Sequence, residues 1–255
     1  TDITDCGNTD GTITITASGN GTIEYSIDGG TTWSQSGAYV GLTAGTYQIR
    51  VRNINGSCEV SAADEIITAP TLPSFVSVTP TSPSDCGIDD GQIVVAAIAG
   101  TGTTQYSING GSNWSNTGTF TGLASGTYNI TIRNSNATCE VSYINNPVVL
   151  VAPDAASITN VASSNPSNCG MIDGTINVTA TGGTAPLQYS IDGGGTWTNT
   201  TGSFTGLAAG TYNVSVRNAD GSCQVNGSII TLVAPVAPSI DNVVAANPSD
   251  CGVTD

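Results

Sequence analysis

Apolar and polar residues alternate in three short stretches of the chain, each directly after a turn that ends in glycine. In the first stretch, Tyr47, Ile49 and Val51 alternate with polar residues, and the stretches at 126–134 and 210–218 repeat the pattern. Because successive side chains of a strand point to opposite faces, a period of two is typical of a strand with one face in a core. The pattern therefore predicts three equivalent β-strands.

A tyrosine opens each of these strands, two residues after the glycine of a Leu-x-x-Gly turn. These residues are Tyr47, Tyr128 and Tyr212. The placement resembles the tyrosine corner of immunoglobulin-like β-sandwiches, where the ring joins the core and the hydroxyl binds backbone a few residues upstream. We expect this structural role for all three residues.

Other strand and turn patterns fill the remaining sequence. The sequence Tyr-Ser-Ile-Asp-Gly-Gly at 25–30 predicts a strand that enters a glycine-rich hairpin turn, and close copies stand at 106–111 and 189–194. An apolar strand is predicted after each proline-bearing linker, as at 75–78. No stretch predicts a helix of useful length. The fold class is therefore all-β, with tandem immunoglobulin-like β-sandwich repeats.

The three tyrosines are 81 and 84 residues apart, so a small domain recurs along the chain. The predicted domains are a first repeat at 1–71 whose first strand is missing or incomplete, repeats at 72–153 and 154–236, and the start of a further repeat at 237–255. We expect the chain to be a segment of a longer secreted protein, with targeting signals elsewhere.

The charge balance excludes two classes of partner. The chain carries a net charge of −15, its four basic residues are all arginine, and it contains neither lysine nor histidine. Nucleic-acid affinity depends on Lys and Arg that neutralise phosphates, and anionic membrane surfaces attract basic segments. We therefore expect no nucleic-acid partner and no direct membrane insertion.

Seven cysteines recur with the repeats. Within each complete repeat the two cysteines are 52, 53 or 54 residues apart, no pair has the Cys-x-x-Cys spacing, and no histidine could complete a zinc site. A domain of about 80 residues buries only about 60–65% of its unfolded surface, so a covalent staple would help it. The pattern predicts disulfides and an oxidising, extracellular location.

Two pairing schemes fit this spacing. The favoured scheme places one disulfide inside each repeat, as Cys6–Cys58, Cys86–Cys139 and Cys169–Cys223, and leaves Cys251 for a partner further along. The rival scheme joins each second cysteine to the next opening, as Cys58–Cys86, Cys139–Cys169 and Cys223–Cys251. We favour the first because a strand and two turns would have to loop around each bridge of the second. The hairpin register also turns the second cysteine of each repeat toward the core face.

The same hairpin register sets charged residues opposite one another on the outer face. It predicts cross-strand pairs of Arg52 with Glu59, Arg133 with Glu140 and Arg217 with Gln224. Three tryptophans follow the glycine-rich turns, at Trp33, Trp114 and Trp197. An exposed indole could stack on a sugar, but equal placement in every repeat favours a packing role.

The Asp/Asn-Cys-Gly-x-x-Asp-Gly openings offer the candidate metal site. Asp85, Asp89 and Asp90 form the densest group of carboxylates, the ligands that calcium seeks. The alternative, which we favour, is a set of solvated turn acids, because Asp-Gly is ordinary turn chemistry. No catalytic residue is proposed: the chain has no histidine or lysine, and no serine or threonine has a base in view.

Three motifs together resemble a known family. The openings with Cys-Gly-x-x-Asp-Gly-Thr-Ile, the Tyr-Ser-Ile-Asp-Gly-Gly turns and the segment Gly-Leu-Ala-Ala-Gly-Thr-Tyr-Asn-Val-Ser-Val-Arg-Asn at 206–218 look like SprB-type repeats. Such repeats occur in very large cell-surface adhesins of gliding Bacteroidota. The family often shows Cys-Asn-Gly-Gly and Tyr-Ser-Trp, where this chain has Cys-Gly-x-x-Asp and Tyr-Ser-Ile. The resemblance implies type IX export and display as long filaments, and it gives no ligand or catalytic residue.

Two hypotheses follow. In the first, the chain is a structural and adhesive segment of a surface filament, a semi-rigid stalk whose partners are adjacent repeats and laterally associated filaments. In the second, each repeat is a binding module for calcium or surface glycans, repeated for avidity. Neither hypothesis includes a resident cofactor or an enzymatic activity.

Overall fold

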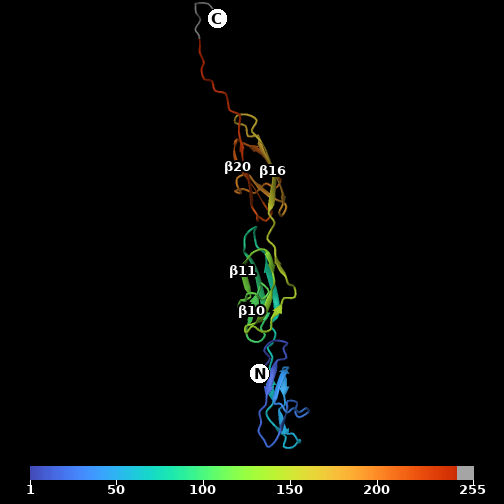
Figure 1. Cartoon of the computed structure of the whole chain (residues 1–255). Coiled ribbons are helices and arrows are strands. Elements are labelled where there is room, and N and C mark those ends of the chain that lie inside the picture. The colour runs from blue at the N-terminus through green and yellow to red at the C-terminus, as the bar shows by residue number, and fades with distance from the viewer. Residues whose placement is uncertain (246–255) are drawn as a thin grey trace, which may run out of the picture. The chain divides into compact units, whose positions relative to one another are not determined.

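The computed structural model describes residues 1–245, which form only β-strands, turns and loops (Figure 1). Among these residues no helix is long and apolar enough to cross a membrane. Strong β-propensity of the Val-, Ile-, Thr- and Tyr-rich stretches, interrupted by glycine-rich turns, accounts for this architecture. The prediction of an all-β fold is confirmed.

The strands fall into three sets of the same order. The first set is β1 (Gly11–Thr14), β2 (Ile23–Ser26), β3 (Ala38–Leu42), β4 (Gly45–Tyr47), β5 (Arg50–Asn53), β6 (Val60–Ser61) and β7 (Glu65–Ile67). The second set is β8 (Ser74–Thr81), β9 (Gly91–Ile98), β10 (Thr104–Ser107), β11 (Thr119–Leu123), β12 (Gly126–Tyr128), β13 (Thr131–Asn134), β14 (Val141–Ser142) and β15 (Val148–Leu150). The third set is β16 (Ala156–Ser164), β17 (Gly174–Gly182), β18 (Gln188–Ser190), β19 (Ser203–Leu207), β20 (Gly210–Arg217) and β21 (Val225–Leu232).

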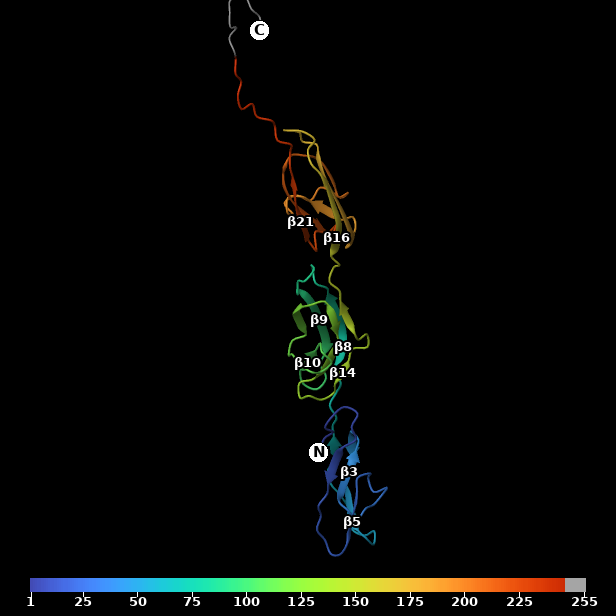
Figure 2. The same cartoon turned by 45° about the horizontal axis from the view of Figure 1, so that its top comes forward.

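Each set folds into two antiparallel layers. In the second set one layer has the order β11-β9-β8 and the other contains β10-β13-β14 with β12-β15, and Figure 2 shows β8 beside β9. The third set repeats this as β16-β17-β19 and β18-β20-β21. The first set keeps the order β2-β5-β6, but its other layer has only β1 and β3.

Three separate hydrophobic clusters lie between these layers, one within each predicted repeat. Equivalent positions supply them. Ile13, Ile93 and Ile176 come from the equivalent strands β1, β9 and β17, and Ile67, Leu150 and Leu232 come from the last strand of each repeat. The alternating stretch that the tyrosine opens, which we call the organising strand, contributes Ile49, Ile130 and Val214, all at most 5% exposed. Alternation therefore placed the core residues on the correct face.

The tyrosine corner is confirmed in all three repeats. The hydroxyl of Tyr47 donates to the carbonyl oxygen of Thr43 at 2.8 Å. Tyr128 donates to Ala124 and Tyr212 to Ala208, both at 2.9 Å. Each ring also packs against the cluster of its own repeat. Together with the two antiparallel layers, this corner is typical of immunoglobulin-like sandwiches.

The chain divides into two compact units. Unit 1 contains Thr1–Pro83 and Gly87–Ala152, and unit 2 contains Ser84–Cys86 and the described residues that follow Ala152. The short segment Ser84–Cys86 thus lies between two parts of unit 1 in the sequence but packs with unit 2. Its last residue, Cys86, is bonded to Cys223 of unit 2, and this disulfide explains why the segment packs with unit 2.

Candidate functional site: a cysteine junction between repeats

Two disulfides lie within the described residues, and each joins neighbouring repeats. Cys6 bonds Cys139 inside unit 1, and Cys86 bonds Cys223 inside unit 2, with Cα atoms 5.0 Å apart in both. Each bridge connects the opening turn of one repeat to the hairpin cysteine of the following repeat. Cys58 and Cys169 carry free thiols. Cys251 lies outside the described residues.

Both pairing schemes drawn from the sequence are therefore wrong. The scheme inside each repeat fails because the two cysteines lie at opposite ends of a sandwich. In the first repeat the opening turn lies beside the end of β7, where the N–H of Ile3 donates to the carbonyl of Thr68, and Cys58 lies in the hairpin between β5 and β6.

The length of the paired strands β4 and β5, which run alongside β7 and β6, rules out a disulfide inside the first repeat. Gly45 pairs with Ile67 and Val51 with Val60, so seven residues of paired strand separate the two ends. The six steps from Gly45 to Val51 span about 20 Å at 3.3 Å per residue. A disulfide requires Cα atoms within about 7 Å of each other. The two cysteines of one repeat are therefore too far apart to bond each other.

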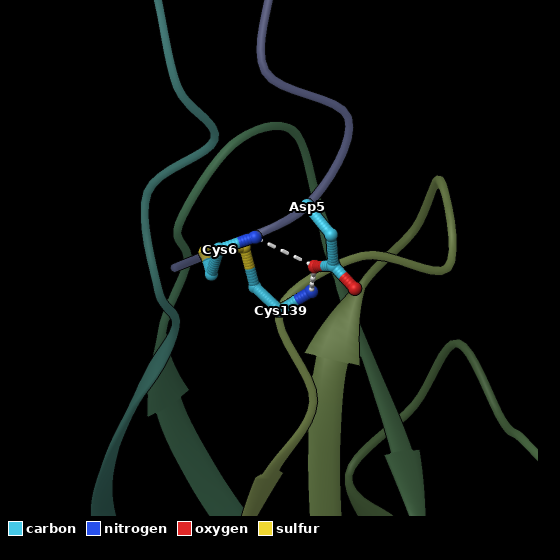
Figure 3. Close-up of side chains that lie close together, drawn as sticks. All are labelled: Asp5, Cys6 and Cys139. Atoms are coloured by element: carbon cyan, nitrogen blue, oxygen red, sulfur yellow. Dashed lines mark hydrogen bonds between the residues drawn. A yellow bond between two sulfur atoms is a disulfide. The ribbon is translucent and has the colours of Figure 1, made fainter. Parts of the chain in front are cut away.

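An aspartate organises each junction. One carboxylate oxygen of Asp5 accepts the backbone N–H of Cys6 at 2.7 Å and that of Cys139 at 2.6 Å (Figure 3). Asp85 accepts the N–H groups of Cys86 and Cys223 in the same way. Since a carboxylate only accepts hydrogen bonds and has several lone pairs, one oxygen can serve both halves of the bridge.

The hairpin cysteines adopt a backbone conformation that favours this contact. Cys139 has φ of 59° and Cys223 has φ of 56°, in the left-handed region that residues with a Cβ seldom occupy. Both residues are 2% exposed. This conformation aims the N–H toward the aspartate of the neighbouring repeat, and the bridge and the hydrogen bond hold it there.

The linker completes the junction through a buried asparagine. The side-chain amide of Asn134 donates to the carbonyl of Thr71 at 3.0 Å, and that of Asn218 donates to the carbonyl of Asp154 at 3.0 Å. Both asparagines are fully buried. A Cβ at Gly100 would lie only 2.0 Å from the Thr71 carbonyl oxygen, so glycine lets the linker approach this closely.

Asn134 and Asn218 were not predicted as site residues. Their signal was present, because an asparagine ends the organising strand in every repeat, at Asn53, Asn134 and Asn218. Buried polar groups need partners, so a recurring asparagine beside a predicted core is a signal of a fixed backbone contact.

The calcium candidates do not gather into one cluster. Among the described residues, the carboxylate and thiol groups that lie close together are Asp5 with Cys6 and Cys139, and Asp85 with Cys86 and Cys223. The sulfur atoms of both groups are in disulfides and the carboxylates already accept two N–H groups each. Asp89 belongs to neither group and is exposed. In this structure Asp5 and Asp85 thus serve as hydrogen-bond acceptors in their opening turns.

The arginines contact partners other than the predicted ones. The hairpin register is confirmed, since Val51 pairs with Val60 and thus sets Arg52 opposite Glu59. Arg52 nevertheless binds Glu24 on the other neighbouring strand at 3.0 Å, and Glu59 binds Arg50 at 2.8 Å.

The other two arginines behave like Arg52: the register sets them opposite Glu140 and Gln224 as predicted, but their side chains bind residues of the other neighbouring strand. Arg133 donates to Gln105 at 3.0 Å, and Arg217 donates to Gln188 at 2.7 Å. A cation–π contact accounts for this choice of partner. Each guanidinium lies over an indole ring, which draws the arginine side chain to that side of its strand.

Each tryptophan stacks with an arginine of its own repeat. The guanidinium carbon lies 4.1 Å from the ring centroid of Trp33 and of Trp114, and 4.3 Å from that of Trp197. The indole N–H of Trp33 also donates to the carbonyl of Gly30. One face of each ring is thus covered by a cation from the same repeat.

Comparisons with known proteins define no family for this chain. No family model matches it, and no curated protein matches it. Solved structures that resemble it include the N-terminal eight Ig domains of Down Syndrome Cell Adhesion Molecule, at 12% identity and a TM-score of 0.39, covering 90% of this chain and 35% of that one. The FN1-FN3 domains of chicken CNTN1 match at 11% identity and a TM-score of 0.28, covering 91% and 98%.

A third similar structure is surface layer protein SbsC, domains 4-9, at 15% identity and a TM-score of 0.20, covering 86% of this chain and 40% of that one. The chain thus spans about a third of the Ig-domain structure. The fold assignment rests on the strands, layers and tyrosine corners described above.

Proposed function

We propose that this chain is a structural and adhesive repeat segment of a large secreted bacterial surface filament, in which it acts as a semi-rigid stalk. The observation that carries the proposal is the pairing of cysteines between successive repeats. A disulfide inside a domain stabilises that domain alone. A disulfide between repeats fixes their junction, which is useful where force passes along the chain.

Three features support an extracellular stalk. Disulfides persist in oxidising compartments, and the two bridges recur at equivalent positions. The linkers at 69–73, 151–154 and 234–238 contain proline, which limits their freedom. At the first linker a buried asparagine side chain also holds the backbone carbonyl of Thr71.

The resemblance to SprB-type repeats extends the proposal to a surface adhesin of Bacteroidota that is exported by the type IX system. The partners are then adjacent repeats of the same chain and laterally associated filaments. A catalytic role is not part of the proposal. A glycan-binding role for the tryptophans is less well supported, since an arginine covers one face of each ring.

Scattering tests the stalk. The oxidised full chain should fit an extended rod with a narrow distribution of shapes, because bridge, linker and asparagine together fix each junction. The variant Cys6→Ser/Cys139→Ser, which retains the Cys86–Cys223 bridge, should scatter as a chain with one loosened joint. A freely jointed profile for the oxidised wild type, or collapse to a compact particle, would remove the stalk from the proposal.

A further inference from the structure

The two cysteines of each bridge differ in their access to solvent. Cys139 and Cys223 lie in hairpins against which the opening turn of the preceding repeat packs, and each is 2% exposed. Their partners in the opening turns, Cys6 and Cys86, are only partly buried. A thiol in solution can therefore reach one cysteine of each bridge, the one in the opening turn.

This difference in access decides which sulfur has to leave when a bridge is reduced. In thiol–disulfide exchange a thiolate attacks one sulfur, and the other sulfur departs with the electron pair of the broken bond. Attack at Cys86 expels the sulfur of Cys223, and attack at Cys6 expels that of Cys139. The leaving sulfur belongs to the buried cysteine in both bridges, so its new negative charge forms away from water, which is costly.

An anion already lies beside the leaving sulfur. Each bridge forms a group with one aspartate, in which a carboxylate oxygen and both sulfur atoms lie within 4.8 Å of one another: Asp5 with Cys6 and Cys139, and Asp85 with Cys86 and Cys223. Like charges at such distances repel, and the repulsion is strongest where water and salt screen it least. The carboxylate therefore opposes both the attacking thiolate and the departing one.

A backbone oxygen lies against the accessible sulfur. The carbonyl oxygen of Pro70 is 3.2 Å from the sulfur of Cys6, and that of Pro153 is 2.9 Å from the sulfur of Cys86. A sulfur in a disulfide has no proton to donate, so these contacts are not hydrogen bonds. They place the negative end of a carbonyl dipole at the sulfur that a reagent must reach.

The positive charges of the second and third repeats point away from the bridges. The chain has neither lysine nor histidine. Arg133 and Arg217 lie over Trp114 and Trp197. Each of these arginines is followed by the buried asparagine of its junction, so alternation along the strand turns the arginine to the opposite face. The carboxylate beside each bridge thus keeps its effect on a nearby thiolate.

We propose that Asp5 and Asp85 protect the two bridges against reduction by thiols, in addition to holding the backbone of the junction. The protection combines the buried leaving sulfur, the carboxylate beside both sulfurs and the carbonyl oxygen against the accessible one. It acts most strongly on thiols that carry further negative charge, such as glutathione. It goes beyond the proposed stalk and does not depend on it, because it concerns only how long the bridges last.

The reaction that the carboxylate slows is a two-step exchange. A reagent thiolate attacks the sulfur of Cys86, the bond to Cys223 breaks, and the Cys223 sulfur leaves as a thiolate that takes a proton from water. A second reagent thiolate then attacks the reagent sulfur of the mixed disulfide and releases Cys86. Two reagent thiols are oxidised to one disulfide, and the bridge is reduced to two thiols.

The test measures how fast each bridge is reduced in the folded full chain. Serine replaces Cys58, Cys169 and Cys251, so the four bonded cysteines remain. Reduced glutathione is the probe, alkylation traps the freed thiols at timed intervals, and mass spectrometry assigns them. Asp85→Asn should raise the initial rate for Cys86–Cys223 by about tenfold or more. The Cys6–Cys139 bridge of the same molecule should keep its wild-type rate and serves as the internal control.

The asparagine variant separates charge from hydrogen bonding. Its amide oxygen can accept the two N–H groups that the carboxylate accepts, so a purely structural role of Asp85 predicts the wild-type rate of reduction. Asp85→Ala removes the charge and the acceptor and should react at least as fast as Asp85→Asn. The control Asp89→Asn removes an exposed carboxylate of the same opening that lies outside the group, and its rate should stay within about twofold of wild type. A wild-type rate for Asp85→Asn would overturn the proposal.

The charge of the reagent gives a second readout. Cysteamine is positively charged, whereas glutathione carries a net negative charge. The ratio of the cysteamine rate to the glutathione rate, each per thiolate, should be several-fold higher for the wild type than for Asp85→Asn, and high salt should narrow the difference. A junction that is merely loosened would react faster with both reagents and leave the ratio unchanged. An unchanged ratio would therefore contradict protection by charge.

The mixed disulfide identifies the attacked sulfur without any change at the junction. Rapid quenching with acid should trap glutathione on Cys86 and on Cys6, with Cys223 and Cys139 as the freed thiols. Glutathione on Cys223 or Cys139 would mean that the accessible sulfur is the one that leaves. That result would refute the proposal, because the departing charge would then form in contact with water.

Discussion

At the residue scale, one carboxylate holds both halves of each bridge. The oxygen of Asp85 accepts an N–H group from each of the two bonded cysteines, and one of these cysteines is buried in a left-handed conformation. The third repeat has Asn168 at this position, whose side-chain oxygen accepts the same local N–H. For this local contact an amide oxygen can take the place of a carboxylate oxygen.

Replacement of Asp85 tests this role. Asp85→Ala leaves the buried N–H of Cys223 without its acceptor and should lower the free energy of unfolding of the third repeat by about 1–3 kcal/mol, measured by urea denaturation. Asp85→Asn should cost less, because an amide oxygen remains. The control Asp89→Ala removes an exposed carboxylate and should stay within about 0.5 kcal/mol of the wild type. Equal effects of the three substitutions would contradict the acceptor role.

The tyrosine corner gives a second prediction at this scale. Tyr128→Phe removes the hydrogen bond to Ala124 and should cost about 0.5–1.5 kcal/mol in the free energy of unfolding. Tyr128→Ala also empties part of the core and should cost roughly 2–4 kcal/mol, less than a fully buried ring because this one is half-buried. Urea unfolding of both variants checks the order. Small and equal losses would mean that the ring does not contribute to the core.

At the element scale, the glycine-rich hairpin turn depends on an aspartate in the first and third repeats and on an asparagine in the second. Asp28 accepts hydrogen bonds from the side chain and N–H of Thr32 and from Ser26, and these contacts lower its pKa to about 2. The side chains of Ser190 and Thr196 likewise lower the pKa of Asp192. Asn109 takes the same place in the second repeat.

These pKa shifts predict an acid-sensitive turn. Because the folded-state pKa of Asp28 and Asp192 lies below the unfolded value of about 3.9, their stabilisation is present above that pH and is lost as pH falls toward about 2. The thermal midpoint of the wild type should fall over this range. Asp28→Asn/Asp192→Asn should fall less, since Asn109 shows that an amide fits the turn. An identical fall in both proteins would assign the acid sensitivity to other groups.

Strand positions were predictable from the sequence to the extent that periodicity determines them. Alternation gave the buried face of the organising strand, and the hairpin count gave the correct register of Val51 with Val60. Register fixes which Cα atoms are opposite and leaves the direction of a long side chain open. Arg52 therefore turned toward Glu24 and Trp33, a choice that depends on a strand distant in the sequence.

The cysteine pairing could not be predicted for a related reason. Constant spacing inside a repeat suggested a bridge inside it, but the spacing of Cys6 to Cys139 and of Cys86 to Cys223 is nearly as constant, at 133 and 137 residues. Spacing cannot choose between these pairings. The choice depends on the ends of the sandwich at which the two cysteines lie, which strand direction decides.

At the scale of the whole molecule, the two disulfides overlap along the sequence. The shortest covalent path from Cys6 to Cys223 crosses both bridges and follows only the 53 residues between Cys86 and Cys139. Fully stretched, this path measures at most roughly 190 Å, whereas the 217 residues of the reduced chain measure roughly 760 Å. The bridges thus limit extension even when every repeat has unfolded.

Stretching of single molecules should reveal this limit. Pulled from its two ends, the oxidised chain should extend between Cys6 and Cys223 by about a quarter of the length that the reduced chain reaches. Cys86→Ser/Cys223→Ser should release the second bridge and give an intermediate length. An oxidised chain that extends as far as the reduced one would show that the bridges do not form in solution.

The overlap of the bridges also changes what a protease can do to this molecule. All four arginines lie between Cys6 and Cys223, in three intervals: Arg50 and Arg52 before Cys86, Arg133 between Cys86 and Cys139, and Arg217 after Cys139. A single cut in one interval, or single cuts in any two, leaves every fragment attached through a remaining bridge. The two ends of the molecule separate only when all three intervals have been cut. A chain joined in this way keeps its covalent continuity through damage that would sever a string of independently stapled domains.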